Sequence, residues 1–117
     1  MLVDDSPRFL DAARRFLATQ AIDIVGEAHT GQEALDLLDV LGPDLVLLDL
    51  ELPDFDGLTV LRRTKARPDA PRVVIVTIHD LEEYRTAVAA AGADGFVPKR
   101  ELTTALVPLI RQLFDVD

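Results

Sequence analysis

The stretch LVLLD at residues 45–49 decides the fold of this chain. Four branched apolar residues in a row, bounded by turn-forming residues, are typical of a strand that is buried on both faces of a sheet. Asp49 ends this run, shortly before the turn-rich stretch LPDFDG at residues 52–57. In open sheets flanked by helices, ligands bind at the carboxyl ends of the strands. Asp49 is therefore the first candidate for a functional side chain.

Other apolar runs also end in side chains that can carry chemistry. These are Asp4 and Asp5 after residues 1–3, Thr77 after residues 73–76, and Lys99 after residues 96–98. Because parallel strands present their carboxyl ends at one edge of a sheet, we expect all of these groups to lie near Asp49. The sequence thus predicts one site that contains carboxylates, a hydroxyl and an amine.

Strand-like and helix-like patterns alternate along the chain. Strands are expected at residues 1–3, 22–26, 45–48, 73–76 and 96–98, and helices at residues 7–17, 34–41, 58–67, 81–91 and 102–113. This alternation favours an α/β fold with a five-stranded parallel sheet, helices on both faces and right-handed crossovers. The helices at 7–17, 34–41 and 81–91 are expected to have the N-caps Ser6, Thr30 and Asp80.

Two prolines modify this scheme. Pro98 lies in the fifth expected strand and argues that this strand is at an edge of the sheet. Pro108 lies inside the last expected helix, which it should kink or shorten, because proline removes one backbone hydrogen bond.

Length and composition exclude several classes of protein. The 117 residues are 49% hydrophobic and 28% charged, which predicts one globular domain over residues 1–117. Twelve basic residues are scattered among 21 acids, giving a net charge of −9, so we expect no direct nucleic-acid binding by this chain. The chain has no cysteine, and no apolar stretch of membrane-spanning length or signal peptide is visible. A cytoplasmic location is expected.

The acidic groups suggest a particular chemistry. Two like charges about 4 Å apart repel by about 4 kcal/mol at an effective dielectric constant of about 20. A fold tolerates Asp4, Asp5 and Asp49 together if a hard cation binds them, and Mg²⁺ suits oxygen ligands. Lys99 and Thr77 could each bind an oxygen of a phosphoryl group. These residues therefore look arranged to receive a phosphoryl group on a carboxylate.

Over essentially its whole length, the chain resembles the receiver domain of two-component response regulators. The motifs that carry the resemblance are VDDSP at residues 3–7, LLDLELPDFDG at 47–57, VT at 76–77 and AGADGFVPK at 91–99. In this order they are highly specific for that family. The resemblance implies a doubly wound sheet of flavodoxin-like strand order 2-1-3-4-5.

The resemblance also implies roles for individual residues. Asp49 would accept a phosphoryl group from a sensor histidine kinase or a phosphotransfer protein. Thr77 and Lys99 would assist, and Thr77 and Phe96 would act as the switch residues. The Mg²⁺ ligands would be Asp4, Asp5, Asp49 and the backbone carbonyl of Glu51.

As a receiver, the chain is expected to be a switch that assists its own phosphorylation and dephosphorylation rather than an enzyme. Its output and possible homodimer surface would be formed by the last two helices and the fifth strand. Regulation of transcription would pass through a domain that this chain does not contain. Ile78 follows Thr77 where receivers often carry a small residue, so it is expected to shield the phosphoryl group from water. His79 is expected near the rim of the site.

Three alternatives remain open at this point. A Mg²⁺-dependent phosphohydrolase with an aspartyl nucleophile would use Glu51 as its acid/base, two residues after Asp49. A flavodoxin-like nucleotide binder would need a phosphate loop after the first strand, where this chain has acids instead. A degenerate receiver would act only as a binding surface, although the complete set of site residues argues against it.

Overall fold

The computed structural model of the chain describes residues 1–115, so the last two residues of the expected domain lie outside the described part. The strands are β1 (Leu2–Val3), β2 (Glu27–Ala28), β3 (Leu45–Leu48), β4 (Arg72–Thr77) and β5 (Gly95–Pro98). The helices are α1 (Pro7–Ala18), α2 (Gly31–Leu41), α3 (Gly57–Lys65), α4 (Glu82–Ala90) and α5 (Leu102–Leu113), with a 3₁₀ turn η1 (Lys99–Glu101) before α5.

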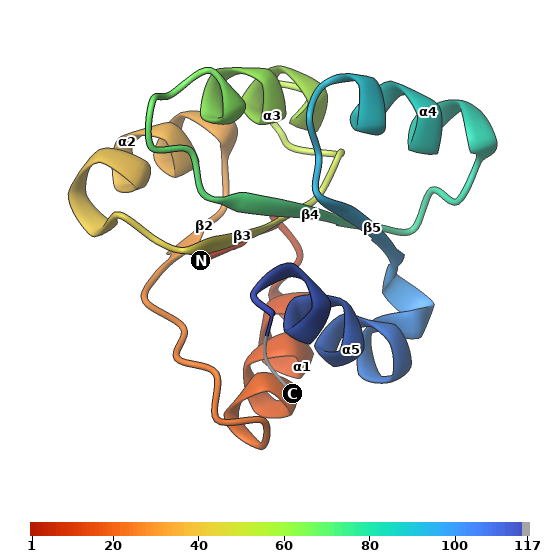
Figure 1. Cartoon of the computed structure of the whole chain (residues 1–117). Coiled ribbons are helices and arrows are strands. Elements are labelled where there is room, and N and C mark those ends of the chain that lie inside the picture. The colour runs from red at the N-terminus through yellow and green to blue at the C-terminus, as the bar shows by residue number, and fades with distance from the viewer. Residues whose placement is uncertain (116–117) are drawn as a thin grey trace.

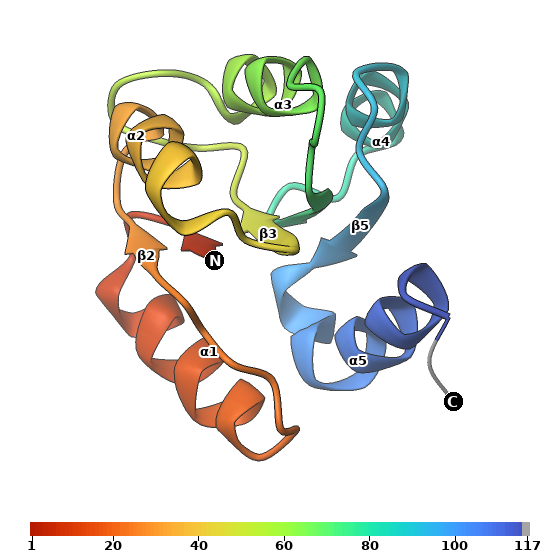
Figure 2. The same ribbon diagram turned by 60° about the vertical axis from the view of Figure 1, so that its left-hand side comes forward.

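The five strands form one sheet of order β2-β1-β3-β4-β5 in which every pairing is parallel. Helices α1 and α5 cover one face, and α2, α3 and α4 cover the other (Figures 1 and 2). The expected fold class and strand order are confirmed. No helix within residues 1–115 is both long enough and apolar enough to cross a membrane.

The core consists of two apolar layers, one on each face of the sheet. Alternation along β4 shows how one strand serves both. Val73 and Ile75 pack into the layer under α2, α3 and α4, and Val74 and Val76 pack into the layer under α1 and α5. All four are at most 1% exposed. Strands buried on both faces need continuous apolar runs, which is why residues 45–48 and 73–76 were readable as strands.

Side-chain caps start two helices where the sequence predicts them. The Ser6 hydroxyl accepts a hydrogen bond from the Phe9 amide at 3.3 Å, and the Thr30 hydroxyl accepts one from the Glu33 amide at 3.0 Å. Helix α3 has a cap that the sequence analysis missed, because the Asp56 carboxylate accepts from the Thr59 amide at 2.7 Å. This helix therefore begins one residue earlier than expected, and it ends at Lys65 rather than at residue 67.

The second strand was placed wrongly. It was expected at residues 22–26, and it forms at Glu27–Ala28 instead. Its position and length are set by its neighbour β1, which has only two residues and pairs Leu2 with Glu27 and Val3 with Ala28. Residues 22–25 precede this paired register, so their apolar pattern does not become a strand.

The N-cap expected at Asp80 is also wrong. Helix α4 begins at Glu82, and Leu81 occupies the cap position. The Asp80 carboxylate is taken instead by two guanidinium groups, with Arg85 Nε at 2.8 Å and an Arg100 nitrogen at 2.6 Å. These two charge-assisted bonds, and no bond to an amide of α4, hold this carboxylate within the described residues.

The two proline expectations have different outcomes. β5 is an edge strand, as Pro98 indicated. Pro108 does not shorten the last helix, because α5 runs without interruption from Leu102 to Leu113, and the kink stays a prediction. Pro108 and Thr104 are both exposed, so water can reach the carbonyl that loses its helical partner at position 104.

Gly57 brings the start of α3 against the end of β3. Its amide donates to the Leu50 carbonyl at 2.7 Å, and a Cβ at this position would lie 2.4 Å from the Asp49 carbonyl oxygen and 2.5 Å from Leu50 Cα. Both neighbours are backbone atoms, which cannot swing aside. No residue other than glycine fits without moving the backbone of Asp49.

Gly57→Ala is therefore expected to lower the free energy of unfolding by about 1–3 kcal/mol, the usual cost of overpacking. Urea unfolding measures this effect. Gly26→Ala is the matched control, because its added methyl would meet only the flexible end of the Leu41 side chain. Equal losses in the two variants would contradict the proposed clash.

Candidate functional site

Three carboxylates come together at the carboxyl ends of β1 and β3. Asp4, Asp5 and Asp49 each offer an oxygen within 4.8 Å of the others. The strand register produces this grouping, because β1 and β3 are neighbours that pair Val3 with Leu48, so Asp4 and Asp49 follow side by side. Asp4 and Asp49 are buried and Asp5 is exposed, so the cluster opens to solvent on one side.

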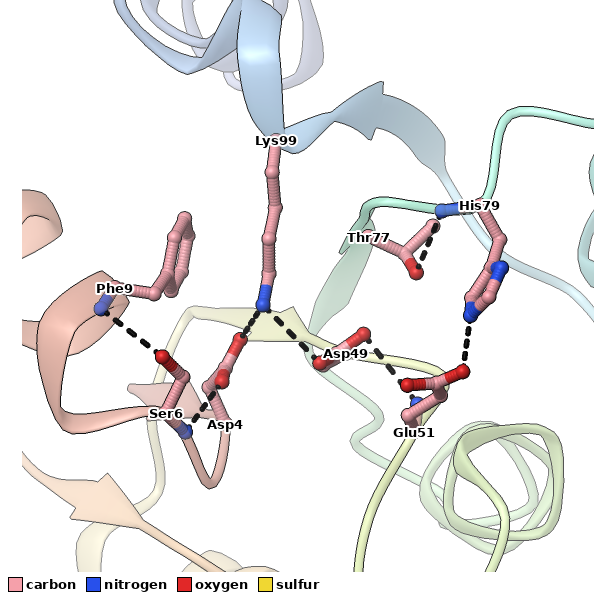
Figure 3. Close-up of polar contacts among 8 residues, drawn as sticks. All are labelled: Asp4, Ser6, Phe9, Asp49, Glu51, Thr77, His79 and Lys99. Atoms are coloured by element: carbon pink, nitrogen blue, oxygen red, sulfur yellow. Dashed lines mark hydrogen bonds and ion pairs between the residues drawn. The ribbon is translucent and has the colours of Figure 1, made fainter.

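Lys99 reaches this cluster from the end of β5. Its Nζ lies 2.8 Å from Asp4 Oδ2 and 3.3 Å from Asp49 Oδ2 (Figure 3). The lysine side chain is 16% exposed, so its charge is largely removed from water. The fold thus brings Lys99 next to Asp4 and Asp49, which are far from it in the sequence, as expected for residues at the carboxyl ends of parallel strands.

The charges in the site affect one another. Burial raises the pKa of Asp49, the Asp4 carboxylate raises it further, and the Lys99 ammonium opposes both. Burial alone would lower the pKa of Lys99, but Asp4 and Asp49 outweigh it and keep that pKa above its usual value. The amine therefore stays protonated at neutral pH.

The oxygen atoms in this cluster fit a divalent cation. Asp4 Oδ1 accepts a hydrogen bond from the Ser6 amide at 2.8 Å, whereas the buried Oδ2 has no hydrogen-bond partner within residues 1–115 apart from its ion pair with Lys99. The Lys99 ammonium contacts two of the three carboxylates, Asp4 and Asp49, and its single charge does not balance the charge of the cluster. Hard cations such as Mg²⁺ take carboxylate oxygens as ligands and keep water on their remaining positions.

Thr77 and His79 follow β4 on the same edge of the sheet. The Thr77 hydroxyl is fully buried and accepts a hydrogen bond from the His79 amide at 3.3 Å. The His79 ring contacts the Glu51 carboxylate through Nε2 and Oε1 (Figure 3). The position expected for His79, near the rim, agrees with this contact. The contact between His79 and Glu51 was not predicted, although Glu51 lies two residues after Asp49 and His79 lies two residues after Thr77.

Glu51 does not join the acid cluster through its side chain, which is exposed and paired with His79. Its backbone does lie beside the site, because the Glu51 amide donates to Asp49 Oδ1 at 3.3 Å. The predicted metal ligand at this residue is its backbone carbonyl, and that role stays a prediction.

Phe96, on β5, is half-buried and packs against the layer under α2, α3 and α4. The Arg85 guanidinium from α4 lies 4.4 Å from the centre of its ring. Because Asp80 binds Arg85 as well, the ring is linked to the loop that follows Thr77.

Asp54 anchors the loop after β3, a role that the sequence analysis missed. Its carboxylate accepts hydrogen bonds from the amides of Gly31 at 2.7 Å and Gln32 at 2.9 Å, in the first turn of α2. These bonds lower the pKa of Asp54. The acceptor and the helix start are more than 20 positions apart in the chain, so no local pattern signals the contact.

Comparison with known proteins agrees with the resemblance noted in the sequence. A sequence model described as "Response regulator receiver domain" matches residues 1–111. The response regulator GacA of Pseudomonas aeruginosa is 34% identical over 116 residues, which cover 97% of this chain and 54% of that protein. The nitrate/nitrite response regulator protein NarL of Escherichia coli K12 is 32% identical over 100 residues, covering 85% of this chain and 46% of that protein. The chain thus spans about half the length of the curated relatives it matches.

Solved structures agree in fold. A two-component response regulator of the LuxR family from Aurantimonas sp. SI85-9A1 superposes with a TM-score of 0.89 at 32% identity, covering 98% of this chain and 83% of that one. The response regulator domain of Thermotoga maritima CheB also gives a TM-score of 0.89, at 26% identity, covering 99% of this chain and 95% of that one. With the acidic cluster, the lysine and the strand order in place, the chain belongs to the response regulator receiver family.

Proposed function

We propose that this chain is a phosphorylatable switch that accepts one phosphoryl group on Asp49 from a sensor histidine kinase or a phosphotransfer protein. The observation that supports the proposal best is the position of Asp49, a buried carboxylate that is grouped with two other acids and paired with the Lys99 ammonium. Mg²⁺ would be held by Asp4, Asp5, Asp49 and the Glu51 carbonyl, and when bound it would neutralise charge on the phosphoryl group.

The residues of this chain have distinct roles in the proposed reaction. An Asp49 carboxylate oxygen forms the new bond to phosphorus, while the bond from phosphorus to the donor's imidazole nitrogen breaks. The Lys99 ammonium binds one phosphoryl oxygen, and the buried Thr77 hydroxyl donates to another. Both donors already lie at this edge of the sheet and are largely removed from water, which favours their interaction with a phosphoryl group.

The output of the switch is also a proposal. The relatives named above are response regulators about twice as long as this chain, so we propose that transcription is regulated through a separate domain. The surface formed by α4, β5 and α5 would transmit the signal and could form a homodimer. Thr77 and Phe96 would couple the phosphoryl group to that surface, since Phe96 contacts Arg85 of α4. A net charge of −9 supports the proposal that this chain does not itself bind nucleic acid.

Incubation with acetyl phosphate and Mg²⁺, followed by intact-protein mass measurement, tests the function. We expect the gain of one phosphoryl group, and no gain when a chelator removes the metal. A parallel assay with p-nitrophenyl phosphate addresses the hydrolase alternative, since sustained turnover would favour an enzyme over a switch. No gain from acetyl phosphate under any condition would favour a receiver that serves only as a binding surface.

Ile78 is expected to slow loss of the phosphoryl group. Its side chain is 65% exposed beside Thr77, so it can obstruct water at the mouth of the site rather than inside it. Ile78→Ala is therefore expected to raise the hydrolysis rate of the phosphorylated protein a few-fold. The decay of the phosphorylated mass with time measures this rate, and an unchanged rate would show that Ile78 does not shield the group. Leu81→Ala, which removes another exposed apolar side chain from the same loop, is the matched control.

A further inference from the structure

The Lys99 ammonium has a third neighbour besides its two carboxylates. The ring of Phe9, on α1, has its centre 4.4 Å from Lys99 Nζ (Figure 3). An ammonium at this distance over an aromatic face is attracted by the quadrupole of the ring, whose face is partially negative, and more strongly when it is shielded from water. Lys99 is 16% exposed, so the shielding condition is met.

Phe9 is itself held in place. Its amide donates to the Ser6 hydroxyl that caps α1, and its half-buried side chain packs against the apolar layer under α1 and α5. The ring is therefore a fixed surface at the start of α1, whereas lysine has a flexible stem of four methylene groups. Something must restrict that stem if the ammonium is to occupy one position.

The carboxylates cannot do this throughout the proposed reaction. Asp49 becomes bonded to phosphorus, and a divalent cation at the site would share the oxygens of Asp4. Both events weaken the attraction between the carboxylates and Lys99, and a bound cation also repels the ammonium. The Phe9 ring is the one contact of the three that neither event alters.

We propose that Phe9 is a positioning residue for Lys99, whose ring keeps the ammonium over the site while Asp4 and Asp49 are engaged elsewhere. This inference rests on the proposed function for its role in phosphoryl transfer. The placement of the ammonium over the ring can be tested without any phosphorylation.

Phosphorylation rates with acetyl phosphate at saturating Mg²⁺ form the first test. Phe9→Leu keeps an apolar side chain but removes the aromatic face, and is expected to slow phosphorylation about five- to tenfold, in line with a shielded cation–π contact. Phe9→Tyr keeps the aromatic face and should restore most of the rate. Phe16→Leu is the matched control, because Phe16 is a half-buried aromatic of the same helix and packs against the same apolar layer.

A double variant separates positioning from a general effect on the fold. In a Lys99→Ala background, Phe9→Leu is expected to have no further effect on the rate. If Phe9→Leu slowed phosphorylation equally in both backgrounds, or if Phe9→Tyr failed to restore the rate, Phe9 would act through packing alone and the proposal would be wrong.

Proton NMR of the unphosphorylated protein forms the second test. Protons of the Lys99 ε-methylene should be shifted upfield by the ring current of Phe9, and Mg²⁺ should leave most of this shift in place. The shift should persist in Phe9→Tyr and vanish in Phe9→Leu. Loss of the shift on adding Mg²⁺ to the wild-type protein would overturn the proposal. This result stands even if Asp49 is not the acceptor, so failure of the two proposals can be told apart.

Discussion

Replacing Asp49 with Asn is expected to abolish phosphorylation by acetyl phosphate while leaving the fold intact. The side-chain amide has nearly the same shape as the carboxylate, but it is not nucleophilic and cannot form the acyl phosphate. Asp49 is the buried acid of the cluster that follows β3 and contacts Lys99. Intact-protein mass after incubation with acetyl phosphate and Mg²⁺ gives the result directly.

Measuring the stability of the Asp49→Asn protein shows whether this variant is folded. Burial, reinforced by Asp4, raises the pKa of Asp49, so the folded protein binds the carboxyl proton of Asp49 more tightly than the unfolded chain does. Protonation of Asp49 therefore stabilises the folded protein at low pH. This stabilisation is lost as the pH rises from the pKa of Asp49 in the unfolded chain through its raised pKa in the folded protein. Without a divalent cation, Asp49→Asn should be at least as stable as wild type at pH 7, and its advantage should disappear at acidic pH.

Asp5→Asn provides the matched control for this experiment. Asp5 belongs to the same acidic cluster but is exposed, and the proposed function gives it a role in cation binding rather than in bond formation. This variant should need more Mg²⁺ but should still gain one phosphoryl group when Mg²⁺ is saturating. Phosphorylation of the Asp49→Asn protein at another residue would contradict the assignment of Asp49 as the acceptor.

The sequence was sufficient to predict the buried strands and the positions of the site residues at their ends. The runs at residues 45–48 and 73–76 are continuously apolar, because each strand is covered on both faces, and their ends place Asp49 and Thr77 on one edge. The edge position of Lys99 followed from the same argument. Once the strand order is known, the proximity of these groups requires no further information.

The errors have a different origin. Residues 22–26 have a strand-like pattern, yet pairing with β1 starts only at Glu27, and pairing between distant segments cannot be read from either segment alone. Asp80 looks like a helix cap, but Arg85 and Arg100 bind its carboxylate. In both cases a tertiary contact overrides a local preference. The contact between His79 and Glu51 was missed for the same reason, since it joins the loops after two different strands.

Replacing Lys99 with Ala is expected to slow phosphorylation by about 10²–10³-fold at saturating Mg²⁺. This is the usual cost of losing one preorganised donor that stabilises the negative charge developing in the transition state. Binding of Mg²⁺ should become tighter in this variant, because the ammonium that now pairs with Asp4 and Asp49 would no longer compete with the cation. A phosphorylation time course, together with a Mg²⁺ titration, measures both effects.

The opposite signs of these two effects are what identify a direct role for Lys99. If the lysine served only to neutralise the acids, Mg²⁺ would replace it and phosphorylation would recover at high metal concentration. Arg100→Ala is the matched control, since it removes one positive charge from the adjacent residue, whose side chain is 63% exposed and pairs with Asp80 instead. This control should phosphorylate within about threefold of the wild-type rate, because an exposed charge is screened by solvent and salt. Similar slowing in both variants would mean that the overall charge of this edge, rather than a bond from Lys99 to the phosphoryl group, controls the reaction.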